Sequence, residues 1–309
     1  MTDPKPERKR APGPDICIIL NPGSGKSKRE SRRQIEAAVA RHPGRFEMRV
    51  LRKGQDIADV ARGAVSDGFA VLVAAGGDGT IGAVAEVVQE AGLTLGLLSM
   101  GTFNFFARGL DLPEDIEAAT DLIVRGSTRK IFVGEVNGRM FLNNASIGLY
   151  PAILAQREGI YKRWGRSRMA AHWSVLRTFM RFHRPLSLTV VVDGRPIRRQ
   201  TPIVFVARSA FQLEFFDVDG VADVEAGKFG LFIAPDKGRL SLILFALRLA
   251  WKSTSSGRDF DYMAGSSIDI ETRSKRRLIA RDGEREKMRS PFVFRMRPDP
   301  LIVIAPEAN

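Results

Sequence analysis

Short apolar runs alternate with amphipathic stretches over the first part of the chain, from Asp15 to about Gly126. Runs without polar alternation are typical of strands that are covered on both faces. Such runs occupy residues 16–20, 70–75 and 93–98, and a weaker strand is predicted near 46–51. Between them apolar residues recur at helical spacing, over 57–65 and 116–124. Strands that alternate with helices predict a doubly wound α/β domain with a largely parallel sheet.

After about residue 128 the pattern becomes mostly β, with turn residues between the runs. Strands are predicted at 186–192, 197–207, 229–234, 267–271 and 278–280. Asp193-Gly194 between two β-rich runs is a strong hairpin signal. Two helical candidates interrupt this region, near 160–183 and 239–252. We therefore predict a domain boundary near residue 130 and a mostly antiparallel β-domain after it.

The length of 309 residues is enough for two domains. No run approaches the roughly 18 apolar residues that a membrane-spanning helix needs. Residues 1–14 are polar and proline-rich with four basic residues, which predicts a disordered basic tail and not a signal peptide. The only cysteine, Cys17, lies in the first apolar run. Since one cysteine forms no internal disulfide, it fits a reducing compartment and a buried place in a strand.

The net charge of +13 suits an anionic partner, which could be nucleic acid, an anionic membrane or an anionic substrate. Residues 157–184 hold eight Lys or Arg and one acid, interleaved with aromatic and apolar residues. A basic, aromatic-rich amphipathic helix is typical of a segment on an anionic membrane surface. A core-facing helix with solvated arginines is the equally weighted alternative, here and for residues 240–251. No nucleic-acid-binding module accompanies the charge, so we expect no nucleic acid partner.

Three glycine-containing turns follow predicted strands of the first domain. Loops at the carboxyl ends of parallel strands gather at one edge of an open sheet, where ligands bind. Glycine lets the backbone approach an anion, and the following helix directs free N–H groups at it. The turns therefore predict a phosphate site. They are Asn21-Pro22-Gly23-Ser24-Gly25-Lys26, Gly76-Gly77-Asp78-Gly79-Thr80 and Met100-Gly101-Thr102-Phe103-Asn104. The first turn lacks the spacing of a P-loop, which disfavours an ordinary P-loop NTPase.

Asp78 is unexpected in an anion site, because a carboxylate repels phosphate. Its presence is explained if it recruits Mg²⁺ or orients the hydroxyl that attacks the phosphate. We expect Thr80 to cap the helix that follows. The alternative is a tight turn with a local cap, which the two similar turns in the same domain make less favoured.

The three turns, together with Ala107-Arg108, have the order and spacing of the diacylglycerol kinase catalytic family, which includes bacterial lipid kinases and the sphingosine and ceramide kinases. Two later segments also resemble that family: Phe-Leu-Asn-Asn-Ala-Ser-Ile-Gly at 141–148, and Asp282-Gly283-Glu284 ahead of a predicted closing strand at 301–304. The resemblance spans roughly 15–306, nearly the whole chain.

The resemblance implies an α/β plus all-β fold, with an N-terminal doubly wound α/β nucleotide-binding domain and a C-terminal β-sandwich domain, as in NAD kinases and diacylglycerol kinases. The implied divisions are the tail at 1–14, an ATP-binding domain at 15–130, a β-rich lipid-substrate domain at 131–295, and a C-terminal strand at 296–309 that returns to the first domain.

Carried over by position, the resemblance implies an ATP-dependent lipid kinase acting on a hydroxyl of a membrane lipid such as diacylglycerol or a sphingoid lipid. Glu284 would be the base that takes the hydroxyl proton, with Asp282 and Asp78 as further catalytic residues. By itself Asp282-Gly283 predicts only a hairpin turn. Mg²⁺ would enter with ATP, with Asp78 as a candidate ligand. The residues expected to bind ATP are Asn21, Ser24, Gly25, Gly76, Gly77, Asp78, Gly79, Thr80, Gly101, Thr102 and Asn104.

Four departures from the family pattern affect the details. Gly82-Ala83 stand in place of Asn-Glu, Phe105 in place of Asp, Leu51 in place of Thr, and Ala226-Gly227 in place of an Asp-Gly pair at a side metal site. The departures keep a catalytically inactive lipid- or nucleotide-binding regulator open as an alternative. A NAD kinase-like enzyme, which shares the Gly-Gly-Asp-Gly turn and the two-domain plan, is the other. We expect a cytoplasmic protein, peripheral on the inner face of the membrane, that serves phospholipid biosynthesis. The acceptor lipid and a homodimer are left open.

Overall fold

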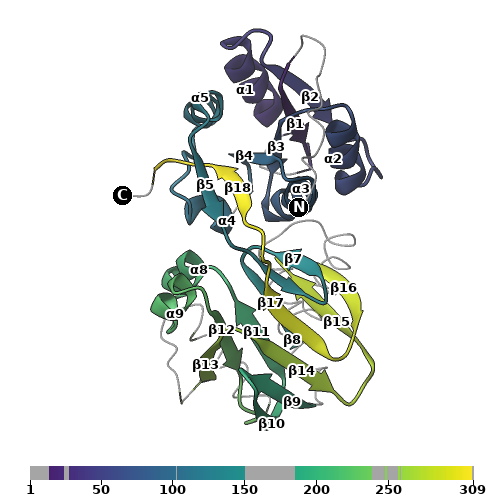
Figure 1. Cartoon of the computed structure of the whole chain (residues 1–309), viewed down its shortest axis with the longest axis vertical. Coiled ribbons are helices and arrows are strands. Elements are labelled where there is room, and N and C mark those ends of the chain that lie inside the picture. Colours follow the sequence, from purple (N-terminus) through teal and green to yellow (C-terminus); the bar gives the residue numbers. More distant parts are fainter. Residues whose placement is uncertain are drawn as a thin grey trace, which may run out of the picture. The chain divides into compact units, whose positions relative to one another are not determined.

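The computed structural model describes residues 14–23, 28–101, 103–149, 185–238, 248, 257 and 259–307 (Figure 1). The chain divides into two compact units. Unit 1 contains residues up to Phe132 together with those from Pro298 onward, and unit 2 contains Val133–Arg297. Unit 1 is therefore built from two separate stretches of the chain, with unit 2 inserted between them.

Unit 1 is organised around a six-stranded sheet of strand order β2-β1-β3-β4-β18-β5. The strands β2, β1, β3, β4 and β18 run parallel, and β5 is antiparallel to β18. All five residues of β1 are buried, as the unbroken apolar run predicts. The strands are β1 (Ile16–Leu20), β2 (Phe46–Val50), β3 (Val71–Gly76), β4 (Thr94–Ser99), β5 (Thr128–Ile131) and β18 (Leu301–Ile304).

The helices of unit 1 form two packed pairs, α1 with α5 and α2 with α3. Side chains of α1 and α5, among them Ile35, Ala119 and Ile123, join the sheet in one apolar core. Two helices begin at an aspartate whose side chain accepts backbone N–H groups, Asp56 for α2 and Asp115 for α5. The helices are α1 (Lys28–Ala40), α2 (Ile57–Ser66), α3 (Asp78–Ala91), α4 (Phe105–Arg108) and α5 (Ile116–Arg125).

Unit 2 contains two six-stranded antiparallel sheets, one of order β10-β9-β14-β17-β6-β7 and the other of order β13-β12-β11-β8-β15-β16. Apolar side chains from both sheets form one shared core, which makes the unit a sandwich. The strands are β6 (Gly134–Val136), β7 (Arg139–Phe141), β8 (Asn144–Gly148), β9 (Leu186–Val192), β10 (Arg195–Thr201), β11 (Ile203–Ala207), β12 (Phe229–Ile233), β13 (Asp261–Gly265), β14 (Ile268–Thr272), β15 (Arg276–Arg281), β16 (Glu284–Arg289) and β17 (Phe292–Met296); two short helices are α8 (Ala210–Phe216) and α9 (Val221–Glu225).

The fold class predicted from the sequence is confirmed: an α/β sheet unit comes first and a β-sandwich follows. The single strand expected at 197–207 is wrong, because the chain there forms β10 in one sheet and β11 in the other. Pro202 lies between the two strands, and a proline lacks the N–H that a continuous ladder needs. The helical candidate at 160–183 lies outside the described residues, as do all but one residue of the candidate at 239–252 and residues 1–13 of the expected tail.

Candidate active site

The glycine turns of unit 1 come together at the carboxyl ends of three neighbouring parallel strands. Leu20 of β1 pairs with Ala75 of β3, and Gly76 of β3 pairs with Ser99 of β4. The chain leaves β1 toward β2 on one side, while β3 lies on the other side of β1. The gap between β1 and β3 is therefore a topological switch point, the place where open α/β sheets bind their ligands.

Asn21 links the first turn to the second. Its side-chain amide donates to Thr80 Oγ1 at 2.9 Å, and its Oδ1 accepts the N–H of Gly23 at 2.9 Å. The expectation that Thr80 caps the helix is wrong, because α3 begins at Asp78 with Gly77 at the N-cap and no side-chain cap. Thr80 is buried within the first turn of α3. Its hydroxyl accepts the amide hydrogen bond from Asn21 and thus holds the two turns together.

Gly76 and Gly101 leave no room for a side chain. A Cβ on Gly76 would lie 2.6 Å from the side chain of Thr80. A Cβ on Gly101 would lie 2.5 Å from Asn104 Oδ1 and 2.9 Å from the Cα of Gly77. The second and third turns are therefore in close backbone contact, which only glycine permits at these positions.

Asp78 connects the second turn to the third. Backbone N–H groups of Asn104, Phe106 and Phe105 stabilise its carboxylate, yet burial dominates and raises the pKa of Asp78. Asn104 has a left-handed backbone (φ 49°), and its Nδ2 donates to the carbonyl of Gly101 at 3.1 Å. Asp78 Oδ1 and Asn104 Oδ1 are both buried without a hydrogen-bond partner. The carboxylate is thus engaged with the start of α4, and one of its oxygens is left for a further donor or cation.

A cavity of about 630 Å³ lies beside the third turn, between α1, the β4–α4 loop and the start of α5. Its wall includes Ser99, Gly101 and Asn104, together with Glu30 and Asp115. Sequence reasoning missed this cavity, because the residues of α1 and α5 that line it carry only the polar pattern of an ordinary helix surface.

In unit 2, Asp282 lies at the tip of the β15–β16 hairpin. Asp282 (φ 45°) and Gly283 (φ 86°) both have positive φ, as a two-residue type I′ turn requires. The Asp282 carboxylate accepts the N–H groups of Leu142 at 2.7 Å, Asn143 at 2.7 Å and Asn144 at 3.1 Å. The residue is half-buried, and loss of solvent around its carboxyl group raises its pKa to about 6 against those three donors. Asp282 therefore fixes the 142–144 segment.

Glu284 begins β16 opposite Arg281 and is exposed. The guanidinium of Arg281 donates to Glu286 Oε2 at 3.2 Å and to the carbonyl of Met140. The carboxylate of Glu284 is thus open to solvent, whereas that of Asp282 at the same hairpin is held by backbone N–H groups. Of the remaining sequence candidates, Gly79 lies in the first turn of α3, while Ser24, Gly25 and Thr102 lie outside the described residues. Among the described residues, no group of three His, Cys, Asp or Glu could hold a metal ion.

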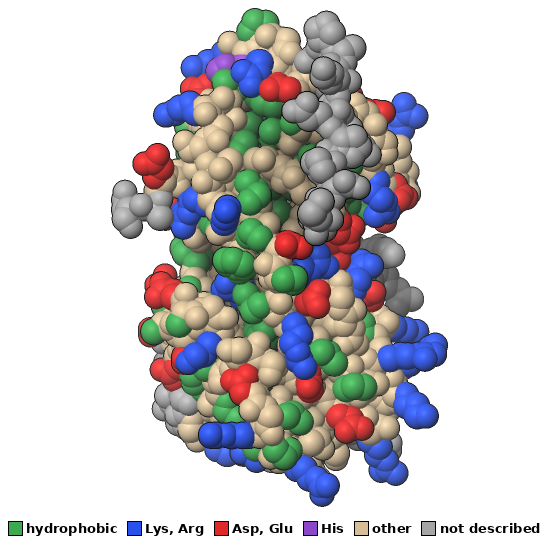
Figure 2. All heavy atoms as spheres, in the orientation of Figure 1, with side chains coloured by type: hydrophobic (Ala, Val, Ile, Leu, Met, Phe, Trp, Pro, Cys, Tyr) green, Lys and Arg blue, Asp and Glu red, His purple; other side chains and the backbone are tan. Residues whose placement is uncertain are grey.

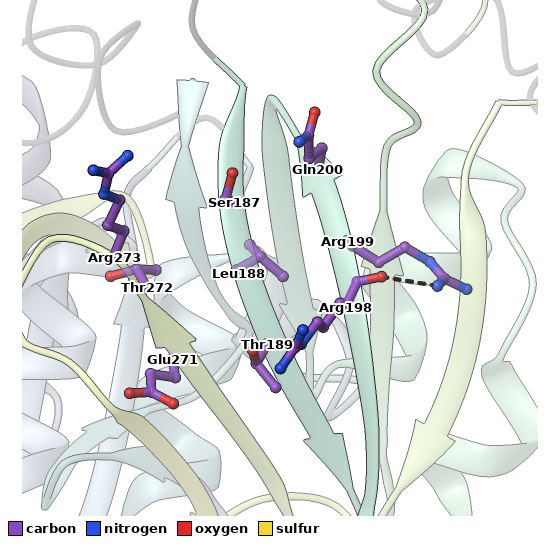
Figure 3. A pocket seen from close by; sticks show the side chains of 9 residues that line it. All are labelled: Ser187, Leu188, Thr189, Arg198, Arg199, Gln200, Glu271, Thr272 and Arg273. Atoms are coloured by element: carbon purple, nitrogen blue, oxygen red, sulfur yellow. Dashed lines mark hydrogen bonds between the residues drawn. The ribbon is translucent and has the colours of Figure 1, made fainter.

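A second hollow, of about 530 Å³, lies on the solvent face of β9, β10 and β14 in unit 2 (Figure 3). Ser187 and Thr189 form its floor, and Arg198 and Glu271 stand on opposite sides of Thr189. None of the residues predicted to act in the site lines this hollow. Charged side chains of both signs are spread over the face of the molecule drawn in Figure 2. The described residues form no helix that is long and apolar enough to cross a membrane.

Comparisons with known proteins give matches to a family model and to named relatives. Residues 15–136 match the family model of the diacylglycerol kinase catalytic domain. Proteins named diacylglycerol kinase from Staphylococcus aureus strains MRSA252 and Newman are 37% identical over 136 and 137 residues. These alignments cover 42% of this chain and 42% of each relative, so less than half of either protein is compared.

Solved structures match over nearly the full length. A crystal structure of a protein from Bacillus anthracis strain Sterne, provisionally described as a diacylglycerol kinase, has a TM-score of 0.72 at 20% identity and covers 97% of this chain and 100% of its own. Another diacylglycerol kinase structure from the same strain has a TM-score of 0.67 at 17% identity, with coverage of 96% and 99%. At this identity the likeness establishes the fold.

Proposed function

We propose that this chain, whose residues 15–136 match the diacylglycerol kinase catalytic family, is an ATP-dependent lipid kinase. It would phosphorylate a hydroxyl of a membrane lipid such as diacylglycerol or a sphingoid lipid. The observation that carries the proposal is the joining of three glycine turns at the β1–β3 switch point within the matched domain. The proposed lipid acceptor is supported by the name of the matched family.

The residues of the turns fit the phosphates of ATP. The bare backbone at Gly76 and Gly101 permits close approach, and α3, 14 residues long, begins at Asp78 with Gly77 at its N-cap and no side-chain cap. Free N–H groups and the helix dipole there favour an anion. We assign Asn21, Ser24, Gly25, Gly79, Thr80, Thr102 and Asn104 to the same phosphate site. Mg²⁺ would arrive with ATP and neutralise phosphate charge. The unpartnered Oδ1 of Asp78 is the carboxylate oxygen that we propose as its protein ligand.

Glu284 is the proposed general base. As the lipid oxygen forms its bond to the terminal phosphorus, the bond from that phosphorus to ADP breaks and the hydroxyl proton passes to the carboxylate of Glu284. The exposure of Glu284 suits this role, since it must reach a proton on an incoming molecule. Asp282 would position the 142–144 segment, because its carboxylate accepts the backbone N–H groups there.

The acceptor must be drawn from a bilayer, and we propose that residues 157–184 dock on an anionic membrane surface. Their eight basic residues and their aromatic residues suit the interface between head groups and acyl chains. In this proposal the protein acts on the inner face of the membrane in phospholipid biosynthesis, with no nucleic acid partner.

Incubation of the purified chain with ³²P-labelled ATP and mixed-lipid vesicles tests the proposal. We expect label in lipid, and we expect Glu284→Gln to lower its rate about 10²- to 10⁴-fold while ATP affinity, measured by calorimetry, stays within about twofold. Glu271→Gln, an exposed acid elsewhere in unit 2, is the matched control and should retain full turnover.

The same assay separates the two alternatives. Label in NAD but not in lipid would identify a NAD kinase-like enzyme. ATP binding without label in either acceptor would identify an inactive regulator. Unchanged turnover of Glu284→Gln would remove Glu284 from the base role.

A further inference from the structure

The 142–144 segment of unit 2 lies between two groups of polar residues. On one side Asp282 accepts its three N–H groups. On the other side the carbonyl of Asn143 accepts the backbone N–H groups of Arg208 at 2.8 Å and Ser209 at 3.2 Å, where β11 ends. The strands β11, β8 and β15 are neighbours in one sheet, so Arg208 and Asp282 stand about two strand spacings, roughly 10 Å, apart.

Arg208 is a partly buried cation without an acidic partner among the described residues. Its Nη1 donates to the carbonyl of Val224 at 3.3 Å, and its Nε is buried with no acceptor. Burial lowers the pKa of Arg208, with no carboxylate to oppose the effect. A guanidinium withdrawn from water without a counter-charge is unfavourable, so a fold that keeps one has a place for an anion.

Buried amide oxygens on the 142–144 segment are also left without donors. Asn143 Oδ1 and Asn144 Oδ1 have no hydrogen-bond partner, although the Nδ2 of Asn144 donates to Gln212 Oε1 at 2.9 Å. Ser146 Oγ, two residues further along β8, is buried and unpartnered as well. Amide oxygens accept hydrogen bonds from hydroxyl groups, and a guanidinium donates to a phosphate. The 142–144 segment and Arg208, which follows the neighbouring strand β11, therefore offer both kinds of contact side by side.

We propose that the acceptor lipid carries a phosphate group close to its reactive hydroxyl, and that Arg208 binds this phosphate while Asn143 and Asn144 accept from the hydroxyl-bearing part of the head group. The acceptor class is a phosphoglycerolipid whose head group ends in free hydroxyls, in preference to a neutral diacylglycerol. This inference rests on the proposed kinase function and narrows its substrate.

The test compares the wild-type chain with Arg208→Gln and Arg208→Lys, using phosphatidylglycerol or dioleoylglycerol as acceptor in vesicles of phosphatidylcholine. The wild type should favour phosphatidylglycerol in kcat/KM. Arg208→Gln should lower the ratio of the two kcat/KM values about 10- to 100-fold, because one charge-assisted contact is lost with one acceptor only. Arg208→Lys should restore part of that ratio, since it keeps the charge but not the planar fork.

Arg198→Gln is the matched control, because Arg198 is an exposed arginine of the same unit in the hollow of Figure 3. It removes one positive charge from the unit and should leave the ratio unchanged. A structural role for Arg208 as a partner of the Val224 carbonyl alone would lower both kcat/KM values by the same factor and leave the ratio unmoved, which would overturn the inference.

Inhibition by inorganic phosphate tests whether Arg208 binds the phosphate of a lipid head group or free phosphate. If phosphate inhibits the wild type but not Arg208→Gln, and the wild type shows no preference for phosphatidylglycerol, the site binds free phosphate and the acceptor assignment is wrong. Label in neither lipid would instead remove the proposed kinase function. A wild-type preference for dioleoylglycerol would keep the kinase and reject the phosphate-bearing acceptor.

Discussion

At the scale of single residues, the β15–β16 hairpin gives two carboxylates that are two residues apart in sequence, Asp282 and Glu284, different surroundings. Asp282 is half-buried and accepts three backbone N–H groups, whereas Glu284 is exposed at the start of β16. An exposed carboxylate can take a proton from an incoming molecule, whereas the oxygens of Asp282 are already engaged by three backbone N–H groups. Asp282 is therefore a positioning residue for the 142–144 segment, and Glu284 is the candidate for chemistry.

The raised pKa of Asp282 has a consequence for stability. Its pKa rises from 3.8 to about 6 on folding, so between these values the folded state holds a proton that the unfolded chain has lost. The resulting stabilisation is fully present below about pH 4 and is lost as pH rises through about 6, an effect of about 3 kcal/mol. Asp282→Asn does not titrate. The free energy of unfolding of the wild type relative to Asp282→Asn should therefore fall across this pH range, as measured by urea denaturation.

Other groups titrate in the same range, but they do so in both proteins and cancel in the difference. A difference that stays flat, or that grows as pH rises, would show that the three N–H donors outweigh burial and that Asp282 is ionised in the folded state.

The role of Asp282 could be predicted from sequence only in part. Asp-Gly indicates a hairpin, and the structure has one. The burial of the carboxylate depends on Leu142 and Asn144, which are 140 and 138 residues away along the chain, so no local pattern contains it. Arg208 was missed for a similar reason: an arginine after an apolar strand has no signal that distinguishes a solvated side chain from an unpaired buried one.

At the scale of elements, prediction succeeded where burial covers both faces of a strand. The runs predicted at 16–20, 70–75 and 93–98 correspond to β1, β3 and β4 within one residue. The strand β16 was missed, because its sequence Glu-Arg-Glu-Lys-Met-Arg has no apolar run. It forms an edge of its sheet, where charged side chains face water and only the backbone pairing identifies a strand.

The packing of the glycine turns leads to a prediction at this scale. In Gly101→Ala the new Cβ would lie 2.9 Å from the Cα of Gly77, so the third turn must move away from the second. We expect a loss of about 1–3 kcal/mol in unfolding free energy, together with weaker binding of a non-hydrolysable ATP analogue by calorimetry.

Gly63→Ala is the matched control for this substitution. Gly63 lies inside α2, and the nearest atom to its Cβ would be Arg49 Nη1 at an ordinary 3.7 Å. Alanine is the better helix former, so stability should rise by about 0.5–1 kcal/mol with unchanged nucleotide affinity. Equal nucleotide affinity in both variants would show that contact between the two turns does not shape the nucleotide site.

At the scale of the whole molecule, the order of strands in unit 1 sets a condition on folding. The strand β18 lies between β4 and β5, although unit 2 separates it from both along the chain. Periodicity can predict a strand at 301–304, but it carries no information on the partner, because pairing is decided by tertiary packing. The return of this strand to the first domain came from the family resemblance alone.

Removal of all residues after Arg297 tests how far unit 1 depends on β18. The deletion takes away Leu301, Val303 and Ile304, all buried, and burial of three such side chains contributes roughly 5–9 kcal/mol. That is comparable with the roughly 5–15 kcal/mol that stabilises a whole domain, and β4 and β5 also lose their common neighbour. We expect hydrogen exchange by mass spectrometry to show fast exchange in β1 and β3 while β9 and β14 stay protected.

A chain that ends at Glu307 keeps β18 and should match the full-length protein in both units. Protection of β3 that survives the longer deletion would mean that unit 1 folds without its last strand.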